Sequence, residues 1–189
     1  MVIVSQGELP FDTVLIDNEG GARRLAEDLV LQGYTRFAIV EGSGALLTSR
    51  DRVRGFLDGL QAHGIDVPEA LRVSGEFTRD GGYYAAGELI ERGLDDVDLV
   101  FAVNDVMAIG VLARLRAASI AVPSRIAVAG FDDISTASAV SPALTTVHLH
   151  IEQIGAAALE LALATRSANG RSVVQIDGSV VQRESTPQR

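Results

Sequence analysis

The sequence predicts an α/β fold built on a doubly wound parallel sheet, and three observations support this prediction. Short runs rich in β-branched residues alternate with longer amphipathic segments along most of the chain. The apolar residues of the longer segments recur at helical spacing, as Leu25, Leu29 and Val30 do. Turn and breaker residues such as Gly33 and Pro123 separate the segments. This alternation is typical of parallel strands connected by helices.

The expected strands and helices follow one another in strict order. The strands are expected at Thr13–Ile16, Arg36–Glu41, Arg72–Ser74, Leu99–Val103 and Ile126–Ala129. The helices between them are expected at Gly21–Gln32, Arg50–His63, Gly81–Glu91 and Val106–Ala118. Ser49 and Asp105 are the residue types that favour helix N-caps, so we expect them to begin the second and fourth helices.

The pattern changes after Gly130. We expect a loop with one helical turn at Phe131–Ala143, an extended segment at Leu144–His148, a helix at Ile151–Thr165, and strands at Val173–Ile176 and Val180–Arg183. The Asp177-Gly178 pair between the last two strands fits a tight hairpin, and it fits equally a single strand that crosses between two lobes through a glycine hinge. Met1–Ser5 indicates the end of a sheet with no helix before it, which favours a truncated chain.

Composition excludes several function classes. The 189 residues carry 16 basic against 25 acidic side chains, a formal net charge of −9. Such a chain repels phosphate backbones unless its basic residues are concentrated, and the densest basic run, Arg50–Arg54, is interrupted by Asp51. The chain has no cysteine, no apolar run long enough to span a bilayer and no signal-peptide layout. We therefore expect no direct nucleic-acid binding, no membrane association and a cytoplasmic location.

The ends of the predicted strands bear the candidate site. In open parallel sheets, ligands bind at the carboxyl ends of the strands. Polar and aromatic side chains follow each of these ends: Asp17 and Asn18, Gly42 to Ser49 with Arg52, Phe77, Asn104 with Asp105, and Phe131 to Asp133. This mixture suits a polar ligand such as a sugar, polyol or nucleoside.

Arg52 and Asp132 are the most informative of these residues. A cation in the first turn of a helix opposes the helix dipole, so Arg52 needs another reason to be there. Its rigid guanidinium fits vicinal hydroxyls or a carboxylate. The alternative is a solvated arginine paired with Asp51 or Asp132. Asp132 is able to accept two sugar hydroxyls, and its alternative is a turn or cap residue that shapes the following loop.

The remaining candidates have weaker signals. Asn104 offers both a donor and an acceptor, which makes it a better ligand residue than its neighbour Asp105. Phe77 and Phe131 can stack on an apolar face of a ligand, although each can equally be a core residue.

No cofactor, metal or catalytic group is expected. Gly42-x-Gly44 lacks the third glycine of a dinucleotide motif, because Leu47 takes its place. His148 and His150 have no accompanying carboxylate-rich segment that would make a metal site. The sequence contains no nucleophile elbow. An enzyme is therefore not expected.

One stretch resembles a known family. Asn104–Gly110 (N-D-V-M-A-I-G) is similar to the N-D-x-M-A-x-G segment of LacI/GalR transcription regulators. Further stretches resemble the same family in the same order: Val14–Asn18, Arg52–Phe56, Val122-Pro123, Val128–Asp133, Pro142–Val147, Ile154-Gly155 and Gln182–Thr186. The resemblance covers nearly the whole chain.

The resemblance implies a periplasmic-binding-protein-like fold of type I, with two α/β lobes joined by crossover strands near Ile16–Asn18, Thr146–His148 and Asp177–Ser179. It implies a complete C-terminal lobe at residues 18–147 and 178–189. The N-terminal lobe would be represented only by residues 1–17 and 148–177, and the DNA-binding headpiece would be absent.

The resemblance also implies a function. Arg52, Asn104 and Asp132 match positions that line the effector cleft of the family, and Phe77 matches a position where an aromatic ring stacks on the ligand. Thr48 and Phe131, which the strand-end rule selects, complete the candidate set. The family's mechanism implies a homodimer that senses a small molecule and reaches operator DNA only through the missing headpiece. Its dimer contacts would involve Val106–Ala118 and Ile134–Ser141.

Two other functions compete with this one. A ribose-type solute-binding protein of a transport system shares the fold, and a small enzyme on a doubly wound sheet is the third hypothesis.

Overall fold

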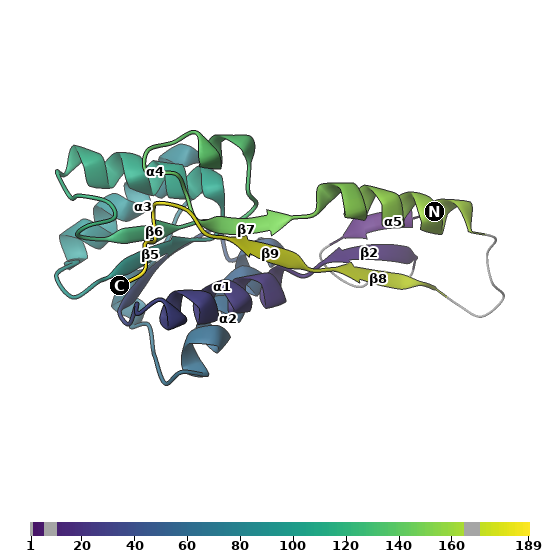
Figure 1. Cartoon of the computed structure of the whole chain (residues 1–189), viewed down its shortest axis with the longest axis horizontal. Helices are drawn as coiled ribbons and strands as arrows, with labels where there is room; N and C mark the ends of the chain where they lie inside the picture. The colour runs from purple at the N-terminus through teal and green to yellow at the C-terminus, as the bar shows by residue number, and fades with distance from the viewer. Residues whose placement is uncertain (1, 6–10, 165–170) are drawn as a thin grey trace.

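The computed structural model describes residues 2–5, 11–164 and 171–189, and it contains two units of unequal size. The larger unit is a four-stranded sheet of strand order β4-β3-β5-β6 with helices α1–α4. The smaller unit is a three-stranded sheet of order β1-β2-β8 with helix α5. Figure 1 shows the smaller unit as a narrow arm that extends from the larger one.

The larger unit confirms the predicted parallel sheet. Its strands all pair in parallel: β3 at Phe37–Glu41, β4 at Arg72–Ser74, β5 at Leu99–Ala102 and β6 at Ala127–Ala129. Its helices are α1 at Asn18–Leu31, α2 at Leu47–Gln61, α3 at Arg79–Arg92 and α4 at Asp105–Ala117. Helices α1 and α2 pack together on one face of the sheet, and α3 and α4 pack together on the other (Figure 1).

Close packing of each helix pair depends on glycine. A Cβ atom on Gly55 of α2 would lie 2.0 Å from the carbonyl oxygen of Glu19, and one on Gly110 of α4 would lie 2.0 Å from that of Arg79. Any side chain at either position would push the paired helices apart. Between the layers, the Phe56 and Phe101 rings stack with centroids 4.1 Å apart in the buried core.

The smaller unit contains β1 at Val2–Ser5, β2 at Asp12–Ile16, α5 at Ile151–Leu163 and β8 at Val173–Ile176. An antiparallel pair, β7 at Thr146–Leu149 with β9 at Gly178–Val181, lies between the two units. Because β8 pairs with β2 while β9 pairs with β7, the predicted hairpin is wrong and the strand that crosses between units is confirmed. Thr165, the expected end of the long helix, lies outside the described residues, as do residues 6–10 and 165–170 of the predicted partial N-terminal lobe.

Two of the expected helix caps are wrong. Helix α4 is capped by Asn104, whose side-chain oxygen accepts from the Met107 amide at 2.7 Å, and Asp105 is the first helical residue. Helix α2 begins at Leu47 after Leu46, which provides no side-chain cap. Ser49 instead accepts the Gly42 amide at 3.0 Å, so its hydroxyl holds the preceding loop. Arg52 consequently lies in the second turn of α2, where the helix dipole opposes a cation less.

The other boundaries are close to those expected. Helix α1 begins three residues earlier than predicted, because Asp17 accepts the Gly20 amide at 2.9 Å and caps it. Gly33 ends this helix as predicted: its φ of 99° is one that glycine adopts without strain, and the Tyr34 amide then reaches the Leu29 carbonyl at 3.2 Å. The predicted helical turn in the loop after β6 is present at Ser135–Ser138.

The described residues contain neither a helix suited to a membrane nor a cluster suited to a metal ion. Among the helices the structure describes, none is both long and apolar enough to cross a bilayer. Within the same residues, no group of three or more His, Asp or Glu side chains is arranged to hold a metal ion.

Candidate ligand-binding site

The candidate site lies at the switch point of the larger sheet, where strands are added on one side of β3 and then on the other. Strands β3 and β5 are neighbours, but the helices that follow them, α2 and α4, cover opposite faces. A crevice opens at such a switch point, at the carboxyl ends of the two strands. The loops after β3 and β5 and the first turns of α2 and α4 therefore form its walls.

Arg52 of α2 reaches from its helix to the end of β5 and to the loop after β6. Its Nε donates to the Asn18 side-chain oxygen at 2.8 Å, and its Nη1 donates to the Val103 carbonyl at 2.8 Å. Its Nη2 pairs with Asp132 Oδ1 at 2.6 Å. These contacts tie α1, β5 and the loop after β6 to one side chain that is 3% exposed. A guanidinium has five N–H donors, and these bonds use three of them.

Phe131 and Asp132 complete the surroundings of the guanidinium. The guanidinium carbon of Arg52 lies 4.0 Å from the centroid of the Phe131 ring. That ring is 0% exposed, so in this structure it supports Arg52 and offers no surface to a ligand. The Asp132 side chain is 25% exposed and is the open end of the pair. Of the alternative for Arg52, the pairing with Asp132 is confirmed and the solvated position is wrong, because the side chain is buried.

Burial shapes the electrostatics of this pair. Desolvation lowers the pKa of the Arg52 guanidinium, and the charge of Asp132 opposes that shift. Desolvation also raises the pKa of Asp132, and Arg52 opposes it through charge and hydrogen bond. Each group thus depends on the other to stay charged in a poorly solvated place. A polar ligand that added hydrogen bonds to both would replace part of the missing solvation.

The cap that was predicted for Asp105 belongs to Asn104. The Asn104 side-chain oxygen accepts the Met107 amide at the start of α4, a bond that does not use its amide nitrogen. Asp105 is fully buried, and it accepts from the Thr146 hydroxyl at 2.6 Å and the Ile134 amide at 2.9 Å. Burial raises the pKa of Asp105 to about 6, and these two hydrogen bonds only partly oppose the shift. Asp105 therefore joins α4 to the loop after β6 and to β7.

Phe77 and Thr48 lie on the β3 side of the crevice. A Cβ atom on Gly42 would be 2.5 Å from the Phe77 ring, so the half-buried ring rests directly on that glycine. Thr48 is half-buried in the first turn of α2. In the described part of the chain, neither residue bonds to Arg52. A hollow of about 440 Å³ on the outer side of α2 is lined by Glu41, Gly44, Ser49 and Arg50, among others.

Sequence reasoning selected Arg52 and Asp132 but not the groups that complete their contacts. Asn18 is one of the residues that follow the predicted strand ends, but the sequence analysis predicts no contact for it. The Val103 carbonyl has no side-chain signal at all, since a backbone acceptor is invisible to residue type. Only the register of β5 beside β3 brings it within reach of α2.

Comparison with known proteins places the chain in a family. A family model described as periplasmic binding protein-like domain matches residues 26–186. The chain belongs to that family. The match spans all of the larger unit's strands and the crossover pair β7–β9, and it confirms the fold expected from the sequence.

The relatives within this family are transcription regulators. The HTH-type transcriptional regulator CelR of Thermobifida fusca is 37% identical over 140 residues, which are 74% of this chain and 41% of CelR. The ribose operon repressor of Escherichia coli K12 is 35% identical over 133 residues, 70% of this chain and 40% of the repressor. The chain thus spans less than half the length of these relatives. They favour a LacI/GalR-type regulator over a transport protein.

Solved structures agree. The complex of the regulator CelR with cellobiose superposes with a TM-score of 0.84 at 32% identity, over 95% of this chain and 55% of that one. A putative LacI-family regulator from Sanguibacter keddieii superposes with a TM-score of 0.86 at 28% identity, over 98% of this chain and 71% of that one.

Proposed function

We propose that this chain is the sugar-sensing part of a LacI/GalR-type transcription regulator, and that it binds its effector at the carboxyl ends of β3 and β5. The observation that carries the proposal is the buried Arg52–Asp132 pair at the switch point of the sheet. The two remaining N–H groups of Arg52, the open edge of Asp132 and the Asn104 amide nitrogen are the proposed contacts to hydroxyl groups. Phe77 and Thr48 are the proposed opposite wall.

The relatives support a sugar as the ligand class. One structural neighbour is a complex with cellobiose, and one relative is named for the ribose operon. A neutral sugar also fits a site whose cation and anion already neutralise each other. We propose a reversible binding role without catalysis, in which the ligand shifts the relative orientation of the two units.

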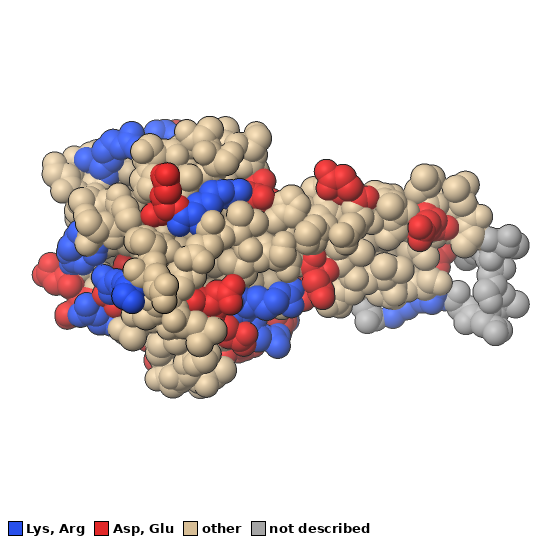
Figure 2. Space-filling view, in the orientation of Figure 1, with Lys and Arg blue, Asp and Glu red and all other residues tan. Residues whose placement is uncertain are grey.

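The larger unit corresponds in this proposal to the C-terminal lobe, residues 18–147 and 178–189. The smaller unit, within residues 1–17 and 148–177, is the part of the N-terminal lobe that this chain contains. A homodimer that acts in the cytoplasm and reaches operator DNA through a separate headpiece completes the proposal. The charge pattern supports DNA binding by the headpiece and not by this chain. Acidic and basic groups are interspersed over the face shown in Figure 2, and the net charge is −9.

Isothermal titration calorimetry against cellobiose, ribose, a polyol and a nucleoside tests the proposal. We expect at least one sugar to bind, and Arg52→Met to weaken it by about tenfold to a hundredfold, the usual cost of lost charge-assisted hydrogen bonds. Arg50→Met is the matched control, because Arg50 is exposed on the same helix. Its affinity should equal that of the parent chain.

A second variant separates binding from folding. Arg52→Met removes a buried cation and leaves Asp132 without its partner, so it will also lower the stability of the fold. A loss of affinity in this variant alone therefore does not separate binding from folding. Asp132→Asn keeps the shape of the site and removes only the charge. Unchanged sugar affinity in both folded variants would remove this crevice from the binding function.

A further inference from the structure

Three backbone segments connect the two units, and the larger unit holds them with polar side chains. The segments are Ile16–Asn18 between β2 and α1, Leu149–Ile151 between β7 and α5, and Ile176–Gly178 between β8 and β9. Arg24 of α1 donates from Nη2 to Asp17 Oδ2 and to the Gly178 carbonyl, each at 3.3 Å. This side chain therefore holds the first and third segments together.

Asp133 binds the strand that leads into the remaining segment and the chain just after β9. Its Oδ2 lies 2.8 Å from His148 Nδ1 on β7, and its Oδ1 lies 2.6 Å from Arg183 Nη2, just after β9. Arg183 also donates to the Leu144 carbonyl at 2.8 Å. The Asp133 and Arg183 side chains are 14% and 18% exposed, so water screens their pair only weakly, whereas the His148 side chain is 36% exposed. One carboxylate thus fixes both strands of the crossover pair to the loop after β6.

The backbone at this point is strained. Asp132 has a φ of 115° and Asp133 a φ of 53°, a range that residues with side chains seldom adopt. The loop is held there by the Asp132 amide, which donates to the Val147 carbonyl at 3.0 Å, and by the Asp133 amide, which donates to the Thr146 hydroxyl at 3.3 Å. Strain of this kind persists only where the surrounding contacts enforce it, and it is concentrated at ligand sites and switches.

The two aspartates face different partners although they are adjacent in the chain. Asp132 pairs with Arg52 in the candidate site, whereas Asp133 pairs with the crossover strands. A rotation of the loop that changed one pair would change the other, because the strained backbone between them has little freedom to absorb it.

We propose that Asp133 is a hinge latch, a positioning residue that fixes β7 and the segment after β9 and couples the Arg52–Asp132 pair to the orientation of the two units. The meaning of the coupling for ligand sensing rests on the proposed function. The latch itself does not, since all of its contacts join protein groups.

Double electron–electron resonance without ligand tests the latch. The chain has no cysteine, so Gln61→Cys on α2 and Glu160→Cys on α5 give two unique label sites, both exposed and one in each unit. Asp133→Asn keeps a residue type that tolerates the left-handed backbone and removes the charge. We expect a second distance population to rise about tenfold, the shift produced when one charge-assisted bond is lost from one of two states.

Matched variants make the result specific. Asp96→Asn removes a carboxylate that is 93% exposed and pairs with Arg36 far from the hinge, so its distance distribution should equal that of the parent chain. His148→Ala should raise the second population, and His148→Gln, which restores a donor toward Asp133, should lower it again. A distribution unchanged in Asp133→Asn and His148→Ala would overturn the latch.

The coupling has its own variant. Asp132→Asn loosens the Arg52 pair without touching the latch contacts, and we expect it to raise the same second population. An unchanged distance distribution in Asp132→Asn would overturn the coupling but would not contradict the latch. Failure of every sugar to bind in calorimetry would contradict the proposed function and leave these distances unaffected, so the two failures are distinguishable.

Discussion

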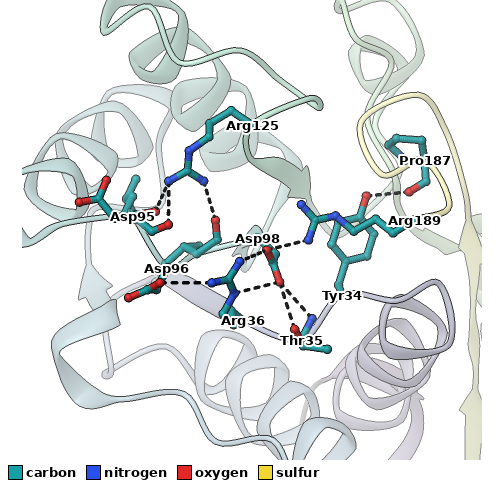
Figure 3. A network of polar contacts seen from close by, with 11 residues as sticks. Tyr34, Thr35, Arg36, Asp95, Asp96, Asp98, Arg125, Pro187 and Arg189 are labelled. Atoms are coloured by element: carbon teal, nitrogen blue, oxygen red, sulfur yellow. Dashed lines mark hydrogen bonds and ion pairs between the residues drawn. The ribbon is translucent and has the colours of Figure 1, made fainter.

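Two buried carboxylates at opposite ends of β5 show how the two edges of the larger sheet differ. Asp98 precedes the strand and Asp105 follows it, and both are nearly or fully buried. Figure 3 shows the Asp98 carboxylate between two arginines, with Arg36 Nη2 at 2.9 Å and Arg189 Nη1 at 2.6 Å. Asp105 has only neutral donors, and two further carboxylates, Asp132 and Asp133, raise its pKa.

The partners decide the ionisation of each group. Burial alone would raise the pKa of Asp98, but hydrogen bonds from Arg36, Arg189 and Thr35 hold it well below its usual range. Burial raises the pKa of Asp105 to about 6, since its hydrogen-bond donors are neutral and the charges of Asp132 and Asp133 add to the shift. The amino edge of the sheet is therefore built for stability. The carboxyl edge retains an unfavourable charge beside the candidate site, as functional sites commonly do.

Asp98→Asn should have the largest effect on this comparison. It removes the charge that three donors were arranged to meet, and we expect a loss of about 2–3 kcal/mol in the free energy of unfolding near neutral pH. Both arginines reach solvent, which keeps the loss below that of a fully buried pair. Urea denaturation measures it. Because folding lowers the pKa of Asp98, its stabilising contribution is complete above the ordinary value of 3.8 and is lost progressively as the pH falls below that value. The difference between variant and parent should therefore shrink in more acidic solution.

Asp96→Asn serves as the control for this measurement, since Asp96 contacts the same Arg36 from the surface. Equal losses in the two variants would show that the buried position of Asp98 has no special importance.

Asp105→Asn should have an intermediate and opposite effect. Since the pKa of Asp105 rises from 3.8 to about 6 on folding, the folded protein binds more protons than the unfolded chain between these values. The parent chain should therefore lose stability as pH rises through that window, by about 2–3 kcal/mol, and the variant should not. Unfolding curves at several pH values compare the two slopes. Identical slopes would contradict the assignment of this dependence to Asp105.

Thr146→Val should have the smallest effect. It removes the hydroxyl that donates to Asp105 at 2.6 Å and preserves the shape of the buried side chain. We expect a loss of about 1 kcal/mol near neutral pH, where Asp105 is ionised, and a smaller loss in acid. Thr146→Ser keeps the donor and should resemble the parent chain. If valine and serine gave the same loss, the hydroxyl would not be what stabilises the Asp105 carboxylate.

The sequence by itself determined most of the larger unit. Alternating apolar runs and amphipathic segments predicted its four parallel strands and four helices, because burial on both faces of a sheet requires apolar strands and helices with one apolar face. The strand-end rule likewise selected Arg52 and Asp132, since parallel strands bring their carboxyl ends to one edge. The pairing of these two residues was one of the alternatives left open by the sequence.

The tertiary structure decided how neighbouring polar residues divide their roles. Asn104 and Asp105 are both good N-caps by residue type, and only the positions of Thr146 and Ile134 assign the cap to Asn104 and the bridging contacts to Asp105. Ser49 likewise does not cap α2, because its hydroxyl accepts the Gly42 amide instead. The chain crosses between the two units at Asp177, because β8 before it pairs with β2 and β9 after it pairs with β7, in two different sheets. Local propensity depends on a few adjacent residues, whereas these choices depend on groups from seven to more than a hundred positions away, which the folded chain brings together.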